Sequence, residues 1–349
     1  MVSMAGPQRL PPQGGLPPAD HRGDGAAEIA CDESGFSGRN LLDAATPVFT
    51  HASVDLSRDE AAELIGMLTS GFRWSASEVK SAQFLRGPRA GEALEWLLAA
   101  LTGRAHVHLI DKEFFLVTRI VDLFLAEPSY AAGTRLTGHQ RMAAVRLHQA
   151  GRTHGRDWSE FLATFAEMVR AKKRRQPDGG AADRFLMARD ALARAGLGAG
   201  ASAVLSGLDR TRVRTVLARL ADGDRSIPPP LEPMLPALAE TILFWSDDRR
   251  PVLVVHDEQS ALTADRLRRL QHVLTDATGA LAGVSRLAGL VTVDSRDDPR
   301  VQVADLLAGI ARRLSAAGDD ALLAPFVSPT SLRGLSGPRP DLTFVTQNR

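Results

Sequence analysis

The chain has 349 residues, enough to bury one large or two smaller hydrophobic cores, and its 44% hydrophobic and 24% charged residues are ordinary for a globular protein. Its formal net charge of +1 gives no overall attraction to nucleic acid, so nucleic-acid binding would require a local basic patch. The single cysteine, Cys31, excludes an internal disulfide, and no apolar run approaches the roughly 20 residues that a membrane span requires.

The two ends of the chain are predicted to lack fixed structure. Residues 1–26 are rich in proline and glycine and contain almost no large apolar side chains, so they cannot bury enough surface to offset chain entropy. Residues 328–349 are similarly loose in composition, although "LTFVTQ" could add a short strand. The N-terminus has neither the charged start nor the apolar stretch of a signal peptide, so the cytoplasm is the expected location.

Between these tails the predicted elements alternate between strand and helix. In the first half, 27–112, they are strand 27–33, strand 48–56, a helix from the capping pattern at Ser57 and Glu60 to about Ser70, helix 89–101 and strand 106–111. In the last half, 251–327, they are strand 252–256, helix 263–278, strand 289–293 and helix 299–314. Residues 113–250 are predicted to be mostly helical, with loops at 176–180 and 226–233. This order favours an α/β layered core carrying a large helical insertion.

Four short acidic motifs stand at predicted strand ends or on one helix face. They are Asp32-Glu33, His256-Asp257-Glu258, Asp294, and the pair Gln302 and Asp305. Carboxylates that folding gathers at strand ends repel one another unless a cation, or a substrate that needs one, is present. The pattern therefore predicts a metal-dependent active site.

Within these motifs, strand geometry ranks the acids. Asp32 and Glu33 are adjacent, so their side chains point to opposite faces, and only one is a straightforward ligand unless the strand ends or bulges there. Asp257 is the preferred residue of its motif, because it ends a strand predicted to be buried on both faces. His256 and Glu258 face the other way, and His256 is expected to be structural.

The last predicted helix carries the most orderly motif. Asp298 is a plausible N-cap and Pro299 a good first helical residue. Gln302, Asp305 and Gly309 share a face beside the apolar stripe. An acid within an apolar helix is unusual, and the nearby glycine permits another element to approach closely, so Asp305 is assigned a functional role.

Several weaker candidates complete the set. Glu78 and Lys80 precede a predicted helix and could serve a metal and a phosphate, or form an exposed ion pair. The secondary candidates are Glu78, Lys80, Asp111, Lys112, Glu258 and Asp294. A basic run could contact a nucleic-acid backbone, although such runs are more often solvated helix ends. It consists of Lys172, Lys173, Arg174 and Arg175.

In this order, the motifs resemble those of the domain-of-unknown-function family 3800, whose members carry an N-terminal Asp-Glu pair and a C-terminal Gln-x-x-Asp. Here these are Asp32-Glu33 and Gln302-x-x-Asp305, and "EVK", "IDK", "HDE" and "VDS" fall where the family has similar islands. The match spans about 27–314. The resemblance implies a ribonuclease H-like fold whose acidic residues bind divalent metal, while the activity of the family is not established. Such a core opens with a three-stranded meander, so a third strand is expected to be short or displaced.

The sequence thus predicts an α/β protein: a ribonuclease H-like mixed sheet flanked by helices, acting as a metal-dependent nuclease. Asp32, Asp257 and Asp305 would hold Mg²⁺ or Mn²⁺, since oxygen ligands without a Cys/His set favour these ions. Glu33 and Gln302 would assist at the site, and Lys80 would neutralise phosphate charge. Two alternatives stay open: a non-catalytic nucleic-acid-binding or regulatory module, and a metal-dependent hydrolase of a small phosphorylated substrate. DNA and RNA are equally compatible with the sequence, as is any oligomeric state.

Overall fold

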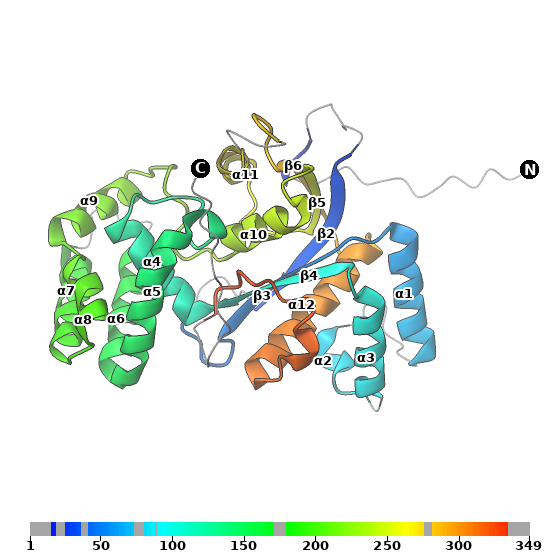
Figure 1. Ribbon diagram of the computed structural model, residues 1–349, viewed down its shortest axis with the longest axis horizontal. Helices are drawn as coiled ribbons and strands as arrows, with labels where there is room; N and C mark the ends of the chain where they lie inside the picture. The colour runs from blue at the N-terminus through cyan, green and yellow to red at the C-terminus, as the bar shows by residue number, and fades with distance from the viewer. Residues whose placement is uncertain are drawn as a thin grey trace, which may run out of the picture. The chain divides into compact units, whose positions relative to one another are not determined.

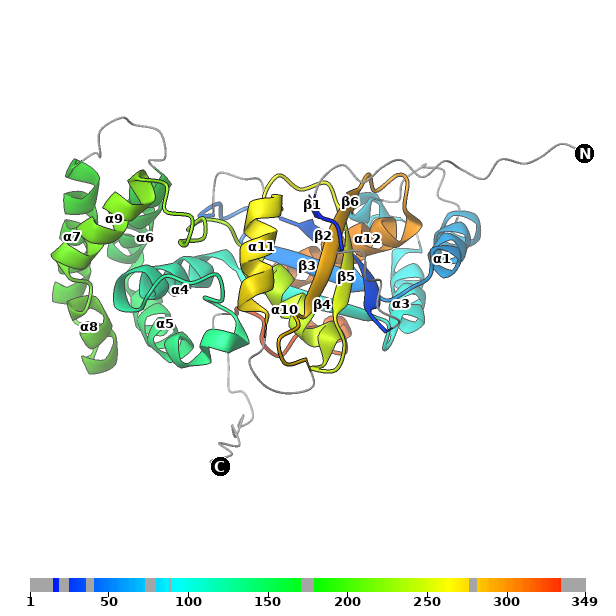
Figure 2. The ribbon, with the colours of Figure 1, turned by 90° about the horizontal axis from the view of Figure 1, so that it is seen from above.

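The structure is a computed structural model that describes residues 15–18, 25–35, 41–72, 80–87, 89–170, 179–275 and 281–333. The chain divides into two compact units (Figures 1 and 2). The sheet unit comprises 1–109 and 232–331, and the helical unit comprises 110–231 and 332–349. No helix in the described ranges is both long and apolar enough to cross a membrane.

The sheet unit is built on a six-stranded mixed sheet, which confirms the predicted α/β class. Its strands are β1 (Gly15–Leu16), β2 (Ala27–Ser34), β3 (Val48–Val54), β4 (Ala105–Asp111), β5 (Val252–Asp257) and β6 (Leu287–Val293). They are arranged in the order β1-β6-β5-β2-β3-β4. β2 is antiparallel to β3 and parallel to β5, β5 is parallel to β6, and β1 is antiparallel to β6.

Helices cover both faces of this sheet. They are α1 (Arg58–Gly71), α2 (Ser81–Phe84), α3 (Ala90–Leu101), α10 (Met234–Ser246), α11 (Ala264–Val273), α12 (Pro299–Ala317) and the 3₁₀ turn η3 (Ala321–Leu323). Figure 1 shows α10 and α12 on opposite sides of β2 and β3, and both helices pack against these strands. The main apolar core lies on the α12 side, where Ala30, Ala52 and Val255 meet buried residues of α12, α1 and α3.

Local signals set the ends of the helices as the sequence predicts. Ser57 and Glu60 form a reciprocal capping box at the start of α1. Asp298 caps α12 by accepting a hydrogen bond from the Arg300 backbone N–H at 3.0 Å, and Pro299 occupies the first turn. The Arg300 guanidinium also donates to Glu28 Oε1 at 2.6 Å, which fixes the start of α12 against β2.

The third strand expected next to β2 and β3 is displaced along the chain. β4 lies beside β3 in the sheet, but α1, α2 and α3 separate the two strands in sequence. The strand predicted at 106–111 is present as β4.

Parts of both tails have fixed positions, which differs from the prediction for 1–26 and 328–349. Gly15 and Leu16 form β1 and pair with Val291 and Leu290 of β6. At the other end, the Ser328 N–H donates to the Val107 carbonyl at 2.8 Å. The segments are short, and it is pairing with a strand edge that orders them.

The helical unit consists of six α-helices and two 3₁₀ turns within the described ranges. They are α4 (Lys112–Leu125), η1 (Arg135–Thr137), α5 (Gly138–Gly151), η2 (Arg152–His154), α6 (Gly155–Arg170), α7 (Gly179–Arg194), α8 (Ala199–Ser206) and α9 (Arg210–Ala221). The unit ends at Leu231, earlier than the predicted insertion of 113–250, because α10 packs on the sheet. Phe124, Phe161, Phe165 and Phe185 form its aromatic core.

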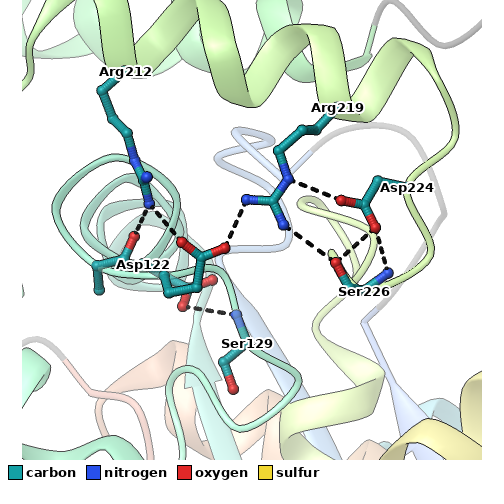
Figure 3. Close-up of polar contacts among 8 residues, drawn as sticks. Asp122, Ser129, Arg212, Arg219, Asp224 and Ser226 are labelled. Carbon is teal, nitrogen blue, oxygen red and sulfur yellow. Dashed lines mark hydrogen bonds and ion pairs between the residues drawn. The ribbon is translucent and has the colours of Figure 1, made fainter.

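Ion pairs bind α9 to the segment after α4 (Figure 3). Arg219 donates to Glu127 Oε1 at 2.6 Å and to Asp224 Oδ2 at 2.8 Å. Arg212 lies 3.2 Å from the other oxygen of Glu127. These arginines therefore have their charge compensated within the unit.

Candidate functional site

The strand register brings Asp32 and Asp257 together. Cys31 of β2 is paired with His256 of β5 in the parallel ladder, so the next residue of each strand, Asp32 and Asp257, are neighbours on the same face. The carboxyl ends of parallel strands are where α/β proteins place functional groups. Asp257 is held in position by the Ser295 backbone N–H, which donates to its Oδ1 at 3.0 Å.

Asp305 approaches from α12 on that same face. Asp32 is paired with Ala52 across the β2–β3 ladder, and Ala52 lies in the core beneath α12. The Thr50 hydroxyl donates to the Ala308 carbonyl at 2.8 Å and fixes β3 to this part of α12. This face of the sheet unit thus carries one acid from each of β2, β5 and α12.

Gly309 allows the adjacent short helix to approach. A Cβ atom at Gly309 would lie 2.1 Å from Ser81 Oγ, so only glycine permits α2 to pack this closely on α12. This contact places Lys80, the residue before α2, so that its Nζ lies 3.1 Å from Asp305 Oδ2. The close approach predicted from Gly309 is confirmed, and its result is a cation beside one acid of the site.

The pKa of the Asp32 carboxyl group reflects its burial and the negative charges around it. Only 6% of Asp32 is exposed. Burial raises the pKa of Asp32 well above its usual range, and the negative charges of Glu33, Asp305 and Asp257 raise it further. The Glu33 backbone N–H, 2.7 Å from Asp32 Oδ1, opposes this shift. The three neighbouring carboxylates thus disfavour ionisation of Asp32.

Glu33 faces the opposite side of the sheet from Asp32, as alternation predicts. It is paired with His51 of β3, on the side covered by α10. Its Oε1 accepts a hydrogen bond from Gln259. Its Oε2 is buried and accepts no hydrogen bond within the described part of the chain. Asp32 is therefore the member of the pair that faces Asp257 and Asp305.

Glu232 is an acid near this edge that the sequence prediction missed. It lies just before α10 and accepts a hydrogen bond from the Met234 backbone N–H at 3.1 Å. Burial raises its pKa to about 7, with a further contribution from the charge of Glu33. Its segment, "PPPLEP", was predicted only as a loop. The sequence signal that could have identified Glu232 is a single acid among proline and apolar residues, a pattern that indicates a buried carboxyl group.

The raised pKa of Glu232 predicts how stability depends on pH. Between about pH 4.5 and 7 the folded protein holds a proton on Glu232 that the unfolded chain has lost, so the free energy of unfolding falls as pH rises. Glu232→Gln should remove this decline, which is on the order of 3 kcal/mol for a shift from 4.5 to about 7. Urea unfolding across this pH range measures it. The exposed Glu63→Gln is the control, and equal pH slopes in wild type and Glu232→Gln would contradict the assignment.

A buried pair of histidines holds the backbone of Asp257. His256 Nδ1 lies 2.9 Å from the Asp257 carbonyl oxygen, which only accepts, so Nδ1 carries the hydrogen and Nε2 is an acceptor. His51 Nε2, 3.2 Å away, then donates to His256, and His51 Nδ1 accepts from the Thr241 hydroxyl at 2.9 Å. Burial lowers the pKa of His51, which keeps it neutral. His256 is therefore structural, as predicted.

The remaining predicted residues have other positions. The Gln302 side chain lies on α12 and donates to the Arg296 carbonyl at 3.5 Å. Asp294 is bound by Arg296, which lowers its pKa to about 2, and Glu258 is exposed. Asp111 caps α4 and Lys112 is buried, both in the helical unit. The residues outside the described ranges are Glu78, Lys172, Lys173, Arg174 and Arg175.

The donor set of the site is made of oxygen. Carboxylate oxygens suit hard cations such as Mg²⁺ and Mn²⁺, and the buried Oε2 of Glu33 retains acceptor capacity. As the side chains stand, no group of three Asp, Glu, His or Cys residues in the described ranges is arranged to hold a metal ion. Asp305 is paired with Lys80 instead.

Comparisons of the chain with protein-family models, with curated proteins and with solved structures find no match.

Proposed function

We propose that this protein is a divalent-metal-dependent nuclease that hydrolyses phosphodiester bonds at Asp32, Asp257 and Asp305. The observation that carries the proposal is the raised pKa of the buried Asp32, which Asp257 and Asp305 increase from two distant segments of the chain. Uncompensated buried carboxylates are costly, and a cation is the simplest compensation. Sites with strongly perturbed carboxyl groups are often functional.

The arrangement of strands supports a ribonuclease H-like fold for the sheet unit. Three strands that are consecutive in the sheet, β2, β3 and β4, follow one another in chain order, and β2 and β3 are antiparallel. This agrees with the opening meander that the resemblance to the domain-of-unknown-function family 3800 implies. Membership of that family is part of the same proposal.

In this proposal Asp32, Asp257 and Asp305 hold Mg²⁺ or Mn²⁺, which supplies charge neutralisation and activation of water. Lys80, exposed beside Asp305, exchanges its carboxylate partner for a substrate phosphate. Glu33 and Gln302 stand next to the ligands in sequence or on the same helix and support their positions. Glu232, near Glu33, holds or releases a proton near neutral pH.

One observation favours a second candidate, a nucleic-acid-binding module without turnover. The Lys80–Asp305 pair neutralises one acid of the site without any metal. A site compensated in this way could keep the fold while lacking the ion that catalysis needs. The two candidates differ in whether divalent metal stabilises the protein.

Metal addition is the direct test. Millimolar Mn²⁺ should raise the melting temperature, because an ion bound only by the native state adds about 2.7 kcal/mol at a hundred times its dissociation constant. Labelled single- and double-stranded DNA and RNA should be cleaved with Mn²⁺ or Mg²⁺ and left intact with EDTA. An unchanged melting temperature together with intact substrates would reject the nuclease. Binding without cleavage under every metal would favour the second candidate.

A further inference from the structure

The net charge of the chain conceals an uneven distribution. Residues 110–231, which form most of the helical unit, contain 20 Lys and Arg against 13 Asp and Glu. The rest of the chain contains 22 Lys and Arg against 28 Asp and Glu. The helical unit is therefore basic, while the acidic cluster lies in a part of the chain with the opposite balance.

The excess positive charge includes a continuous stretch around α5. No Asp or Glu occurs between Glu127 and Asp157. Exposed residues of α5 recur every three or four positions at His139, Met142, Arg146 and Gln149, which places them along one side of the helix, and the exposed Arg152 follows in η2. We call the polar members of this row the α5 basic face: His139, Arg146, Gln149 and Arg152.

Few acids lie on the elements packed against this face, and α6, which packs against η2, carries Asp157 and Glu160 in its first turns. α8 contributes no acid, since none occurs between Asp190 and Asp209. α4 carries two acids, of which Asp122 is buried beside Arg119. The other, Glu113, accepts a hydrogen bond from Trp158 Nε1 at 3.0 Å.

Glu113 also contacts the last turn of α5. Its Oε1 lies 3.1 Å from the buried His148 Nε2, and this contact, more than any other, keeps its pKa low. A Cβ at Gly151 would meet the Trp158 ring at 2.2 Å, so glycine permits the indole to reach Glu113. The carboxylate therefore serves internal partners, with Arg152 more distant at 3.9 Å.

The arginines of α9 provide a contrast within the same unit. Arg212 and Arg219 are bound by Glu127 and Asp224 (Figure 3). Arg210 lies 2.5 Å from Asp183. Arg146 of the α5 basic face, in contrast, makes no ion pair with any residue that the structure describes.

An open pocket lies at the C-terminal end of the α5 basic face. It has a volume of about 330 Å³ and is lined by His148, Gln149, Arg152 and Thr153. Its lining combines a guanidinium with amide and hydroxyl groups, which donate to phosphate oxygens. A phosphate group suits such a lining by charge and by hydrogen-bond donors.

We propose that the α5 basic face binds the phosphate backbone of a nucleic acid; the choice of this polyanion rests on the proposed nuclease function. A row of cations along one helix suits a ladder of phosphates. A membrane-surface helix instead needs a broad exposed apolar face, whereas α5 buries Ala144, Val145 and Leu147 and exposes a single large apolar side chain, Met142.

The test is nucleic-acid affinity of the full chain in EDTA, where hydrolysis does not contribute. Arg146→Ala with Arg152→Ala should weaken binding of a labelled DNA or RNA duplex about tenfold or more at low salt. It should also reduce the slope of log K against log salt by about 1.8, for two lost phosphate contacts. The matched control, Arg210→Ala with Arg214→Ala, removes two arginines that already share Asp183 and should change neither quantity.

Equal loss in both double variants would overturn the proposal, because it would show a response to net charge alone. Unchanged affinity in the α5 variant would also overturn it, as would binding to vesicles of acidic phospholipid without binding to nucleic acid. If the α5 variant loses binding while wild type never cleaves with any metal, the nuclease proposal fails and the binding face stands.

Discussion

Asp32→Asn should be more stable than the wild type in EDTA, yet gain no stability from Mn²⁺ and cleave no nucleic acid. The substitution keeps an oxygen for the Glu33 backbone N–H and removes a buried charge that Glu33, Asp305 and Asp257 oppose. The stability difference between Asp32→Asn and the wild type should grow as pH rises. Because the pKa of Asp32 is raised in the folded protein, the folded state holds a proton that the unfolded chain has already lost, and the wild type loses stability as pH rises above the usual pKa of an aspartate.

Activity should fall on the order of a thousandfold, equivalent to about 4 kcal/mol of transition-state stabilisation. Thermal melts with EDTA and with Mn²⁺, beside a cleavage assay, measure all three effects. Asp319→Asn, which removes an exposed acid beyond α12, is the control and should resemble the wild type. A variant that is less stable in EDTA, or one that Mn²⁺ still stabilises fully, would contradict the assignment of Asp32.

Arg119→Met should be the most destabilising single change in the helical unit. The Arg119 and Asp122 side chains are only 3% and 1% exposed, with Arg119 NH1 3.7 Å from Asp122 Oδ2. Arg119 also donates to the Ala132 carbonyl and lies over the Phe115 ring at 5.0 Å. Removing one partner of a buried ion pair leaves the other charge uncompensated, which costs about 3–5 kcal/mol.

The loss should be larger at pH 8 than at pH 5. Burial raises the pKa of Asp122 to about 7 even with Arg119 present, and without that cation it should rise further. At pH 5 the carboxyl group is protonated in the folded state, so the missing guanidinium matters less. Arg119→Met with Asp122→Leu should therefore recover most of the stability lost at pH 8.

Hydrogen exchange of the helical unit can follow this effect separately from the sheet unit. The control is Arg184→Met, which breaks an exposed pair with Glu167 at 2.9 Å and should cost no more than about 1 kcal/mol. Equal losses in Arg119→Met and Arg184→Met would show that the buried pair has no special role.

The sequence by itself determined the features that depend on a few neighbouring residues, such as the ends of helices. The capping box at Ser57, the Asp298–Pro299 start of α12 and the close approach at Gly309 follow from side-chain chemistry over one or two helical turns. The same local reasoning selected Asp32, Asp257 and Asp305 as candidates, because each follows an apolar pattern that marks a strand end or a helix face.

Only the tertiary structure decided which of these residues meet and on which side of the sheet. The parallel register of β2 and β5 joins segments more than 200 residues apart and directs Asp32 rather than Glu33 toward Asp305. The burial of Glu232 and the contact between His51 and His256 depend on the packing of α10 against the opposite face of the sheet. Strand pairing is a long-range choice with a period of two residues, so short sequence patterns restrict the possible faces but do not select the partners.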